Sequence, residues 1–181
     1  NREELEVREH GRFKDCWYCF SRPQNLKEFE AVKIMTPEIA LGCQMTIDAT
    51  GEMYHTTKVY SFVFDDKVKD DLNYLLGVLN SKALWFFLRS TGYILRGGYF
   101  TFKTEYLRPF PIACSLSKNP PSVKEQAEIS GLVKKRLELG KSPEGQALEI
   151  EEIERVINAA VYRLYNLTKE EIRIVEGESK N

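Results

Sequence analysis

The order of apolar and polar positions divides the chain into a β-rich first part and a helical second part. Residues 31–64 carry short apolar runs, and the most regular of them, residues 58–64, is apolar on both faces of a strand. From residue 66 the apolar positions recur at steps of three and four, as they do in amphipathic helices. The pattern predicts an α+β fold: a small mixed or antiparallel sheet with packed helices, followed by a C-terminal antiparallel helical hairpin.

Strands are expected where aromatic and β-branched residues gather between turn residues. Residues 58–64 should form a central strand, because a strand with two apolar faces is usually covered on both. Residues 48–52 should form a turn in which Gly51 adopts a positive φ. The expected strands are residues 13–20, 32–35, 43–47, 58–64 and 99–103.

Helices are predicted from residue 72 onwards. Four leucines between residues 72 and 79 share one helical face, and Ser81 should cap a second helix that ends at Gly92. A helical turn should follow at residues 104–108, where two prolines then stop it.

The sequence pattern in the last third of the chain predicts a separate helical unit. Residues 115–122 are polar and hold two prolines, so they are expected to form a linker. Two amphipathic stretches follow at residues 123–139 and 148–167, and their short connection favours antiparallel packing. We therefore divide the chain into residues 1–114 and residues 115–181.

The charge balance limits the kinds of partner. The chain has 26 Lys and Arg residues against 27 Asp and Glu residues, a net charge of −1. This excludes a strongly basic binding protein but not a local basic patch. Since no apolar run approaches the roughly 20 residues of a membrane span and no signal peptide is visible, we expect a cytoplasmic protein without a membrane partner. Because the chain begins at Asn1 rather than Met, we also expect it to be part of a longer protein.

The sequence carries no pattern typical of a catalytic or metal site. Cys16 and Cys19 have CxxC spacing, but zinc needs two further ligands, and His10 and His55 do not form a recognisable ligand pair. The Asn-Pro-Pro-Ser tetrapeptide at residues 119–122 lacks the aromatic fourth residue of an adenine methyltransferase motif, and no glycine-rich cofactor loop precedes it. We expect reduced cysteines and no catalytic residue, metal or cofactor in this chain.

One basic stretch lies between residues 82 and 108. It holds five Lys or Arg residues against Glu105 alone, a net charge of +4 (five minus one). Aromatic residues are interleaved with the cations, and Arg96 precedes the pair Gly97-Gly98. Cations bind phosphates, arginine also contacts guanine, and glycines let a backbone approach a nucleic acid closely. The alternative is that the aromatic residues pack in the core and the cations only surround them.

Two other partner classes fit parts of this pattern. The stretch RGGYFTF is similar to one strand motif of RNA-recognition domains, although Gly98 and Tyr99 stand in reversed order and no second motif is evident. The helices after residue 123 could instead form an intermolecular bundle. The chain would then be a protein-interaction or oligomerisation module without nucleic-acid contact.

The order of motifs from Trp17 to Ile112 resembles the TaqI-like C-terminal specificity domain. This domain occurs in adenine-specific DNA methyltransferases and in restriction-modification enzymes of type IIG. The short matching pieces include Ser21-Arg22-Pro23, Val32-Lys33-Ile34 and Asp48-Ala49-Thr50-Gly51. The most specific pieces are YLLGVLNSK at residues 74–82, GYFTFK at residues 98–103 and YLRPFPI at residues 106–112.

The resemblance implies a target-recognition domain that binds duplex DNA opposite a separate, upstream catalytic domain of the same chain. That domain would bind S-adenosylmethionine and methylate a flipped adenine, with or without a fused endonuclease, so this chain would itself be no enzyme. Arg96 is the leading candidate for a base or phosphate contact, while the lysines are expected to contact phosphates. The residues expected at the DNA are Arg22, Lys33, Lys58, Arg96, Gly97, Gly98, Tyr99 and Lys103.

Overall fold

The computed structural model describes residues 1–21, 25–141 and 143–177. Short helical turns come first, and four short strands follow them. In chain order these elements are α1 (Arg2–Glu6), α2 (Arg8–Gly11), the 3₁₀ helices η1 (Lys14–Cys16) and η2 (Leu26–Glu30), and the strands β1 (Lys33–Pro37), β2 (Ile39–Ala40), β3 (Thr46–Asp48) and β4 (Val59–Phe62).

The second part of the chain is mostly helical, so the predicted α+β class and the C-terminal helical hairpin are confirmed. None of the helices in the described ranges is long and apolar enough to cross a membrane. The elements are α3 (Leu72–Leu79), α4 (Lys82–Thr91), β5 (Phe100–Thr101), α5 (Thr104–Leu107), α6 (Val123–Gly140), α7 (Ala147–Leu164) and α8 (Lys169–Glu176).

The main sheet is antiparallel, with the strand order β3-β1-β4. β1 is the central strand, because Ile34 pairs with Ile47 of β3 on one side and with Phe62 of β4 on the other. The prediction that residues 58–64 form the central strand is therefore wrong, and β4 lies at an edge. The first four residues of β1 are buried, although a lysine and a threonine among them conceal this burial in the sequence.

The strand predicted for residues 13–20 does not form. This segment holds η1 and turns, and the guanidinium of Arg8 donates hydrogen bonds to the carbonyl oxygens of Trp17 (2.8 Å) and Cys19 (3.0 Å). Trp17 also makes an edge-to-face contact with Tyr18. The aromatic content favours a strand, but Arg8 binds carbonyl groups that a neighbouring strand would need.

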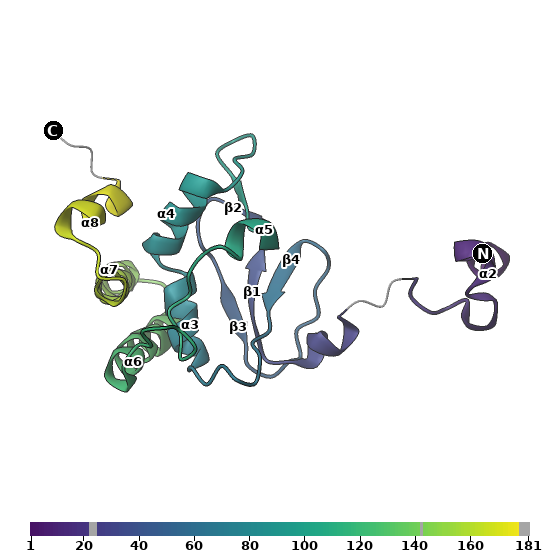
Figure 1. Ribbon diagram of the computed structural model, residues 1–181, viewed down its shortest axis with the longest axis horizontal. Helices are drawn as coiled ribbons and strands as arrows, with labels where there is room; N and C mark the ends of the chain where they lie inside the picture. Colours follow the sequence, from purple (N-terminus) through teal and green to yellow (C-terminus); the bar gives the residue numbers. More distant parts are fainter. Residues whose placement is uncertain (22–24, 142, 178–181) are drawn as a thin grey trace.

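Helix α3 lies at the centre of the core. Its last six residues are buried, and Figure 1 shows it between the sheet and the hairpin of α6 and α7. Gly77 permits close packing of α6, because a Cβ atom there would lie 2.6 Å from Cγ2 of Ile129 and 3.0 Å from Cγ2 of Val133. These two residues and Ile34 of β1 belong to one buried cluster. The segments on either side of residue 114 therefore share a core.

Candidate nucleic-acid interface

The glycine pair of the basic stretch forms the turn of a β-hairpin. Ile94 forms an antiparallel bridge with Phe100, and the N–H group of Leu95 donates to the carbonyl oxygen of Tyr99 at 2.7 Å. Gly97 and Gly98 have φ angles of 87° and 82°, a left-handed conformation that glycine adopts without the steric cost of a Cβ atom. The predicted turn is thus confirmed, and it presents Arg96 at the tip of the hairpin.

Backbone pairing and aromatic packing fix the base of this hairpin. β5 pairs with β2, with Ala40 opposite Phe100, and the N–H group of Phe102 donates to the carbonyl oxygen of Glu38 at 2.8 Å. Trp85 of α4 contacts Phe100 edge to face at a centroid distance of 5.2 Å and stacks on Phe102 at 6.4 Å. Phe100 and Phe102 are buried, so for these two rings the core-packing alternative is confirmed.

Other large side chains of the hairpin remain exposed. Tyr93 and Ile94, before the turn, are each 59% exposed, and Tyr99, directly after it, is 42% exposed. The ring of Tyr99 lies over the turn, since a Cβ atom at Gly97 would be 3.4 Å from two of its ring carbons. The hairpin therefore carries the buried rings of Phe100 and Phe102 at its base and the exposed ring of Tyr99 at the turn that holds Arg96.

Four exposed cations lie on this hairpin or on the two helices that flank it in sequence. Arg89 lies in the last turn of α4, Arg96 at the tip, Lys103 directly before α5 and Arg108 directly after it. None of the four forms an ion pair with a carboxylate in the part of the chain that the structure describes. α4 contacts α5, and Figure 1 shows the hairpin loop projecting at the same end of the molecule. We call these four residues the basic cluster.

Lys58 lies near the base of the hairpin but its charge is already paired. The N–H group of Glu38 donates to the carbonyl oxygen of Lys58 at 2.8 Å, and the carbonyl oxygen of Glu38 accepts from Phe102. Lys58 is therefore two strand spacings, about 10 Å, from Phe102. Its ammonium group is exposed and lies 3.1 Å from the carboxylate of Glu38, which offsets its charge.

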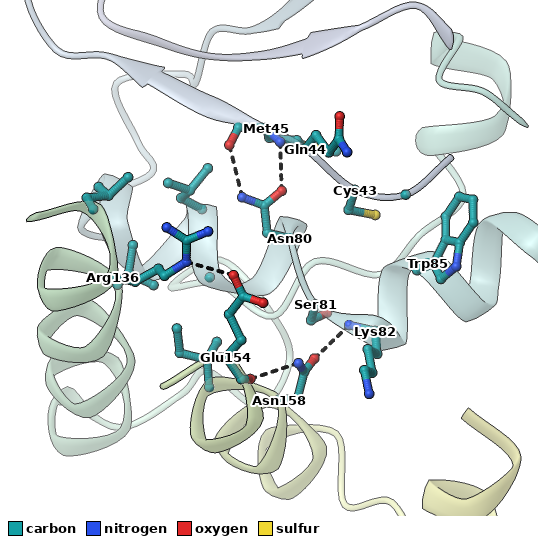
Figure 2. Close-up of a pocket in the computed structure, with 16 residues that line it drawn as sticks. Cys43, Gln44, Met45, Asn80, Ser81, Lys82, Trp85, Arg136, Glu154 and Asn158 are labelled. Carbon is teal, nitrogen blue, oxygen red and sulfur yellow. Dashed lines mark hydrogen bonds and ion pairs between the residues drawn. The ribbon is translucent and has the colours of Figure 1, made fainter. Parts of the chain in front are cut away.

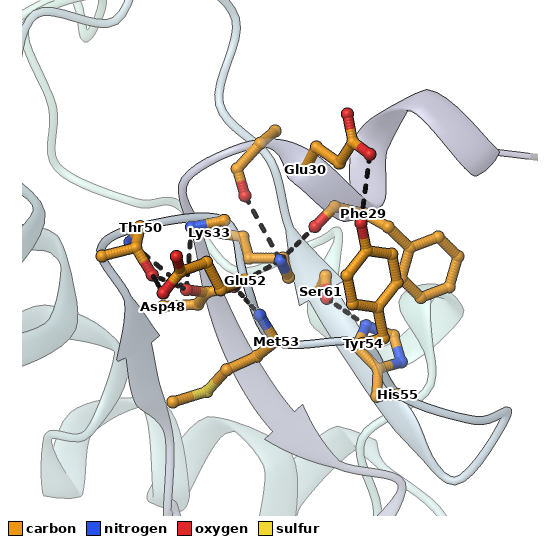
Figure 3. A network of polar contacts seen from close by, with 12 residues as sticks. Phe29, Glu30, Lys33, Asp48, Thr50, Glu52, Met53, Tyr54, His55 and Ser61 are labelled. Atoms are coloured by element: carbon orange, nitrogen blue, oxygen red, sulfur yellow. Dashed lines mark hydrogen bonds and ion pairs between the residues drawn. The ribbon is translucent and has the colours of Figure 1, made fainter.

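The phosphate contact expected for Lys33 is wrong, because its side chain is fully buried. The ammonium group donates to the carbonyl oxygens of Phe29 (2.6 Å) and Ala31 (3.3 Å) and to the carboxylate of Asp48 (2.5 Å), as Figure 3 shows. An ammonium group enclosed by three acceptors cannot reach a phosphate. The sequence suggests an exposed strand face here, because Lys33 alternates with Val32 and Ile34. Its partner Asp48 is fifteen residues away, so the buried ion pair leaves no local signal.

Asp48 connects this buried pair to the loop that follows β3. Its carboxylate accepts from the backbone N–H groups of Thr50 (3.3 Å), Gly51 (2.9 Å) and Met53 (2.9 Å). The hydrogen bond from Lys33, assisted by these backbone bonds, holds the pKa of Asp48 well below its usual range. Gly51 has a φ of 74°, as predicted. The pair therefore stabilises the scaffold rather than the interface.

An aromatic stack that the sequence analysis missed lies beside this pair. The rings of Phe29 and Tyr54 stack at a centroid distance of 5.7 Å, and the hydroxyl of Tyr54 donates to the carboxylate of Glu30 at 3.1 Å. The spacing of 25 residues between the two rings gives no local signal. The neighbouring carboxylate makes this surface a poor match for phosphate.

A groove of about 700 Å³ opens between residues 42–45, the junction of α3 and α4, and the α6–α7 hairpin (Figure 2). Most polar groups of its lining already bind one another. Its cations are therefore less suited to a phosphate than the basic cluster is. The bonded pairs are Asn80–Met45, Asn158–Lys82, Arg136–Glu154 and Lys82–Glu176.

Two other expectations concern the N-terminal segment. Arg22, which was expected to contact DNA, lies outside the described residues.

Cys16 and Cys19, which have CxxC spacing, share a side-chain hydrogen bond that raises the pKa of Cys16. Within the described ranges, no group of three or more His, Cys, Asp or Glu side chains is arranged to hold a metal ion.

A hairpin with a cationic tip on a packed scaffold is an arrangement typical of nucleic-acid-binding domains. The model of one family, the TaqI-like C-terminal specificity domain, matches residues 2–112. The chain belongs to this family, which confirms the resemblance seen in the sequence. The family assignment indicates a DNA target-recognition role in methyltransferases and is consistent with a non-catalytic part of such an enzyme. No curated protein matches the sequence significantly.

Proposed function

We propose that this chain recognises a specific duplex DNA sequence as the specificity domain of an S-adenosylmethionine-dependent adenine DNA methyltransferase. The observation that carries the proposal is the basic cluster around a rigidly held hairpin in a chain of net charge −1. Charge concentrated on one surface positions a protein on the DNA backbone without a basic composition overall. The family assignment supports DNA as the polyanion.

In this proposal the hairpin supplies the sequence-dependent contact. Arg96 at the tip is long enough to enter a groove and donate two hydrogen bonds to a guanine edge, while Lys103 contacts a phosphate. Lys58 would contact a phosphate only after leaving the carboxylate of Glu38. Gly97 and Gly98 carry no side chain that would hold the turn away from the DNA, and Tyr99 packs against the turn. The buried rings of Phe100 and Phe102 reduce the mobility of the hairpin base.

The chemistry belongs to another part of the enzyme in this proposal. A separate catalytic domain of the same protein binds S-adenosylmethionine and methylates an adenine that has left the duplex. The specificity domain sets the register and orientation of the enzyme on the duplex. No residue of this chain takes part in methyl transfer. The enzyme acts in the cytoplasm, either as a methyltransferase alone or with a fused nuclease as in type IIG systems.

Selection of DNA from a random pool tests this function. Purified protein is incubated with duplexes that contain a randomised segment, and the bound fraction is sequenced after several rounds. We expect one enriched motif for the wild type. The Arg96→Ala variant should lose about 1–3 kcal/mol of discrimination at one base pair, because the bidentate contact is absent.

Lys118→Ala is the matched control, because Lys118 is an exposed lysine in the segment between α5 and α6 and is not part of the basic cluster. This variant should select the wild-type motif with unchanged preference. Unchanged affinity and unchanged preference of the Arg96→Ala variant would show that the hairpin tip is not the recognition element.

A further inference from the structure

The strands β2 and β5 form a two-stranded ribbon with one inward face and one outward face. Single backbone contacts flank it on both edges, from Phe100 to Ile94 and from Glu38 to Lys58. Ala40, Phe100 and Phe102 are buried on the inward face, where Trp85 contacts both phenylalanine rings. Side chains alternate between the two faces of a strand. The side chains of Ile39, Tyr99 and Thr101, which alternate with these three, therefore lie on the outward face.

The large apolar side chains of the outward face are exposed, although Thr101 on the same face is buried. Ile39 is 44% exposed, Leu41, directly after β2, is 55% exposed, and Tyr99 is 42% exposed. Ile39 pairs with Thr101, and Tyr99 stands two residues before Thr101, so both lie on the same face. Single apolar side chains are common on protein surfaces, but a group on one ribbon face marks a contact surface. We call Ile39, Leu41 and Tyr99 the apolar strip.

Cations stand at both ends of this strip. Arg96 lies at the hairpin tip, directly before Gly97, which the ring of Tyr99 approaches. Lys103 follows β5 on the outward side, two residues after Thr101. The carboxylate of Glu38, which precedes β2, is paired with Lys58. An apolar strip between two cations complements a surface that has negative charge on both sides and apolar groups between them.

The major groove of duplex DNA is such a surface. It is about 12 Å wide, admits a two-stranded β-ribbon, and exposes the C5-methyl groups of thymine between two rows of phosphates. We propose that the outward face of the β2–β5 ribbon enters the major groove, where Ile39 and Leu41 contact thymine methyl groups. This inference rests on the proposed function and extends it, because it assigns base discrimination to two apolar residues outside the basic cluster.

Removal of single methyl groups from the DNA tests this assignment. In the motif selected by the wild-type protein, each thymine is replaced in turn by deoxyuridine, which lacks only the C5-methyl group, and affinity is measured by fluorescence anisotropy. For at least one position the wild type should lose about fourfold in affinity, the value expected for one buried methyl group. The Ile39→Ser or the Leu41→Ser variant should bind thymine and deoxyuridine equally at that position.

Leu148→Ser is the matched control, because Leu148 is an exposed leucine near the start of α7. This variant should keep the wild-type preference for the methyl group. The inference is overturned if deoxyuridine has no effect at any position, if the selected motif contains no A·T pair, or if both serine variants still discriminate. Serine variants that bind DNA normally but change the sedimentation of the protein would assign the strip to a protein contact and would also overturn it.

The two proposals fail in different ways. Wild-type protein that enriches no motif contradicts the proposed function itself. Wild-type protein that enriches a motif, depends on Arg96 and ignores thymine methyl groups contradicts only the role of the apolar strip.

Discussion

At the scale of single residues, the Lys33–Asp48 pair shows how a buried charge can organise a loop. The carboxylate accepts one bond from the ammonium group and three from backbone N–H groups that follow β3. The ammonium group in turn holds the end of η2 through the carbonyl oxygen of Phe29. Removing either charge would leave its partner buried without compensation, which is far more costly than losing an exposed pair.

The Asp48→Asn substitution should therefore lower the free energy of unfolding at pH 7 by about 3–5 kcal/mol, as measured by urea denaturation. The matched control is Glu149→Gln, which removes the exposed pair with Lys135 and should cost less than about 1 kcal/mol. Similar losses in the two variants would contradict the structural role of the buried pair.

The same pair predicts a pH dependence with a definite sign. The pKa of Asp48 is lower in the folded protein than the value of about 3.9 in an unfolded chain. Its stabilisation is therefore complete above pH 4 and is lost as the pH falls below 4 towards the folded-state pKa. The stability difference between wild type and Asp48→Asn should narrow as the pH falls below 4, and a constant difference there would contradict the assignment.

At the scale of elements, α3 is the helix around which the others are arranged. It contacts β3 of the sheet and both helices of the C-terminal hairpin. The close approach of α6 depends on the absence of a side chain at Gly77, which faces Ile129 and Val133. This contact joins the helical hairpin to the part of the chain that carries the basic cluster.

The Gly77→Ala substitution should lower the free energy of unfolding by about 1–3 kcal/mol, because the added methyl group overpacks the contact between α3 and α6. Gly131→Ala is the opposite case, since Gly131 lies in α6 with open space around its Cβ position and should raise stability by about 0.5–1 kcal/mol. Thermal or urea denaturation measures both. Stabilisation by both substitutions would contradict the close packing.

The elements that the sequence predicts well are those determined locally. The helical spacing and the cap at Ser81 place α3 and α4 within a few residues, and the glycine pair predicts the hairpin turn. The strand order could not be predicted, because it depends on pairing between segments far apart in sequence. Lys33 was expected to be exposed because its partner Asp48 lies fifteen residues away. The place of Ile39 beside Tyr99 could not be predicted, because it depends on the pairing of Ile39 with Thr101.

At the scale of the whole molecule, the proposed function depends on the contrast between paired charges on the helical hairpin and unpaired cations in the basic cluster. Many charges in the described part of α6 and α7 are paired, as in Arg136–Glu154 and Arg163–Glu128. The cations of the basic cluster have no such partners among the described residues. A nearly neutral protein with an unpaired basic cluster should bind a polyanion in the orientation that turns this cluster towards it. That orientation presents the hairpin to the DNA and leaves the helical hairpin on another side.

The salt dependence of DNA binding tests this claim most directly. Affinity for the selected duplex is measured from 50 to 200 mM salt for the wild type, for the double variant Arg96→Ala/Lys103→Ala, and for the control Lys118→Ala/Lys124→Ala. Each lost phosphate contact lowers the slope of log affinity against log salt by about 0.9. The account predicts a slope reduced by about one unit in the first double variant, for the phosphate contact of Lys103, and unchanged in the control. Equal slopes in all three proteins would contradict it.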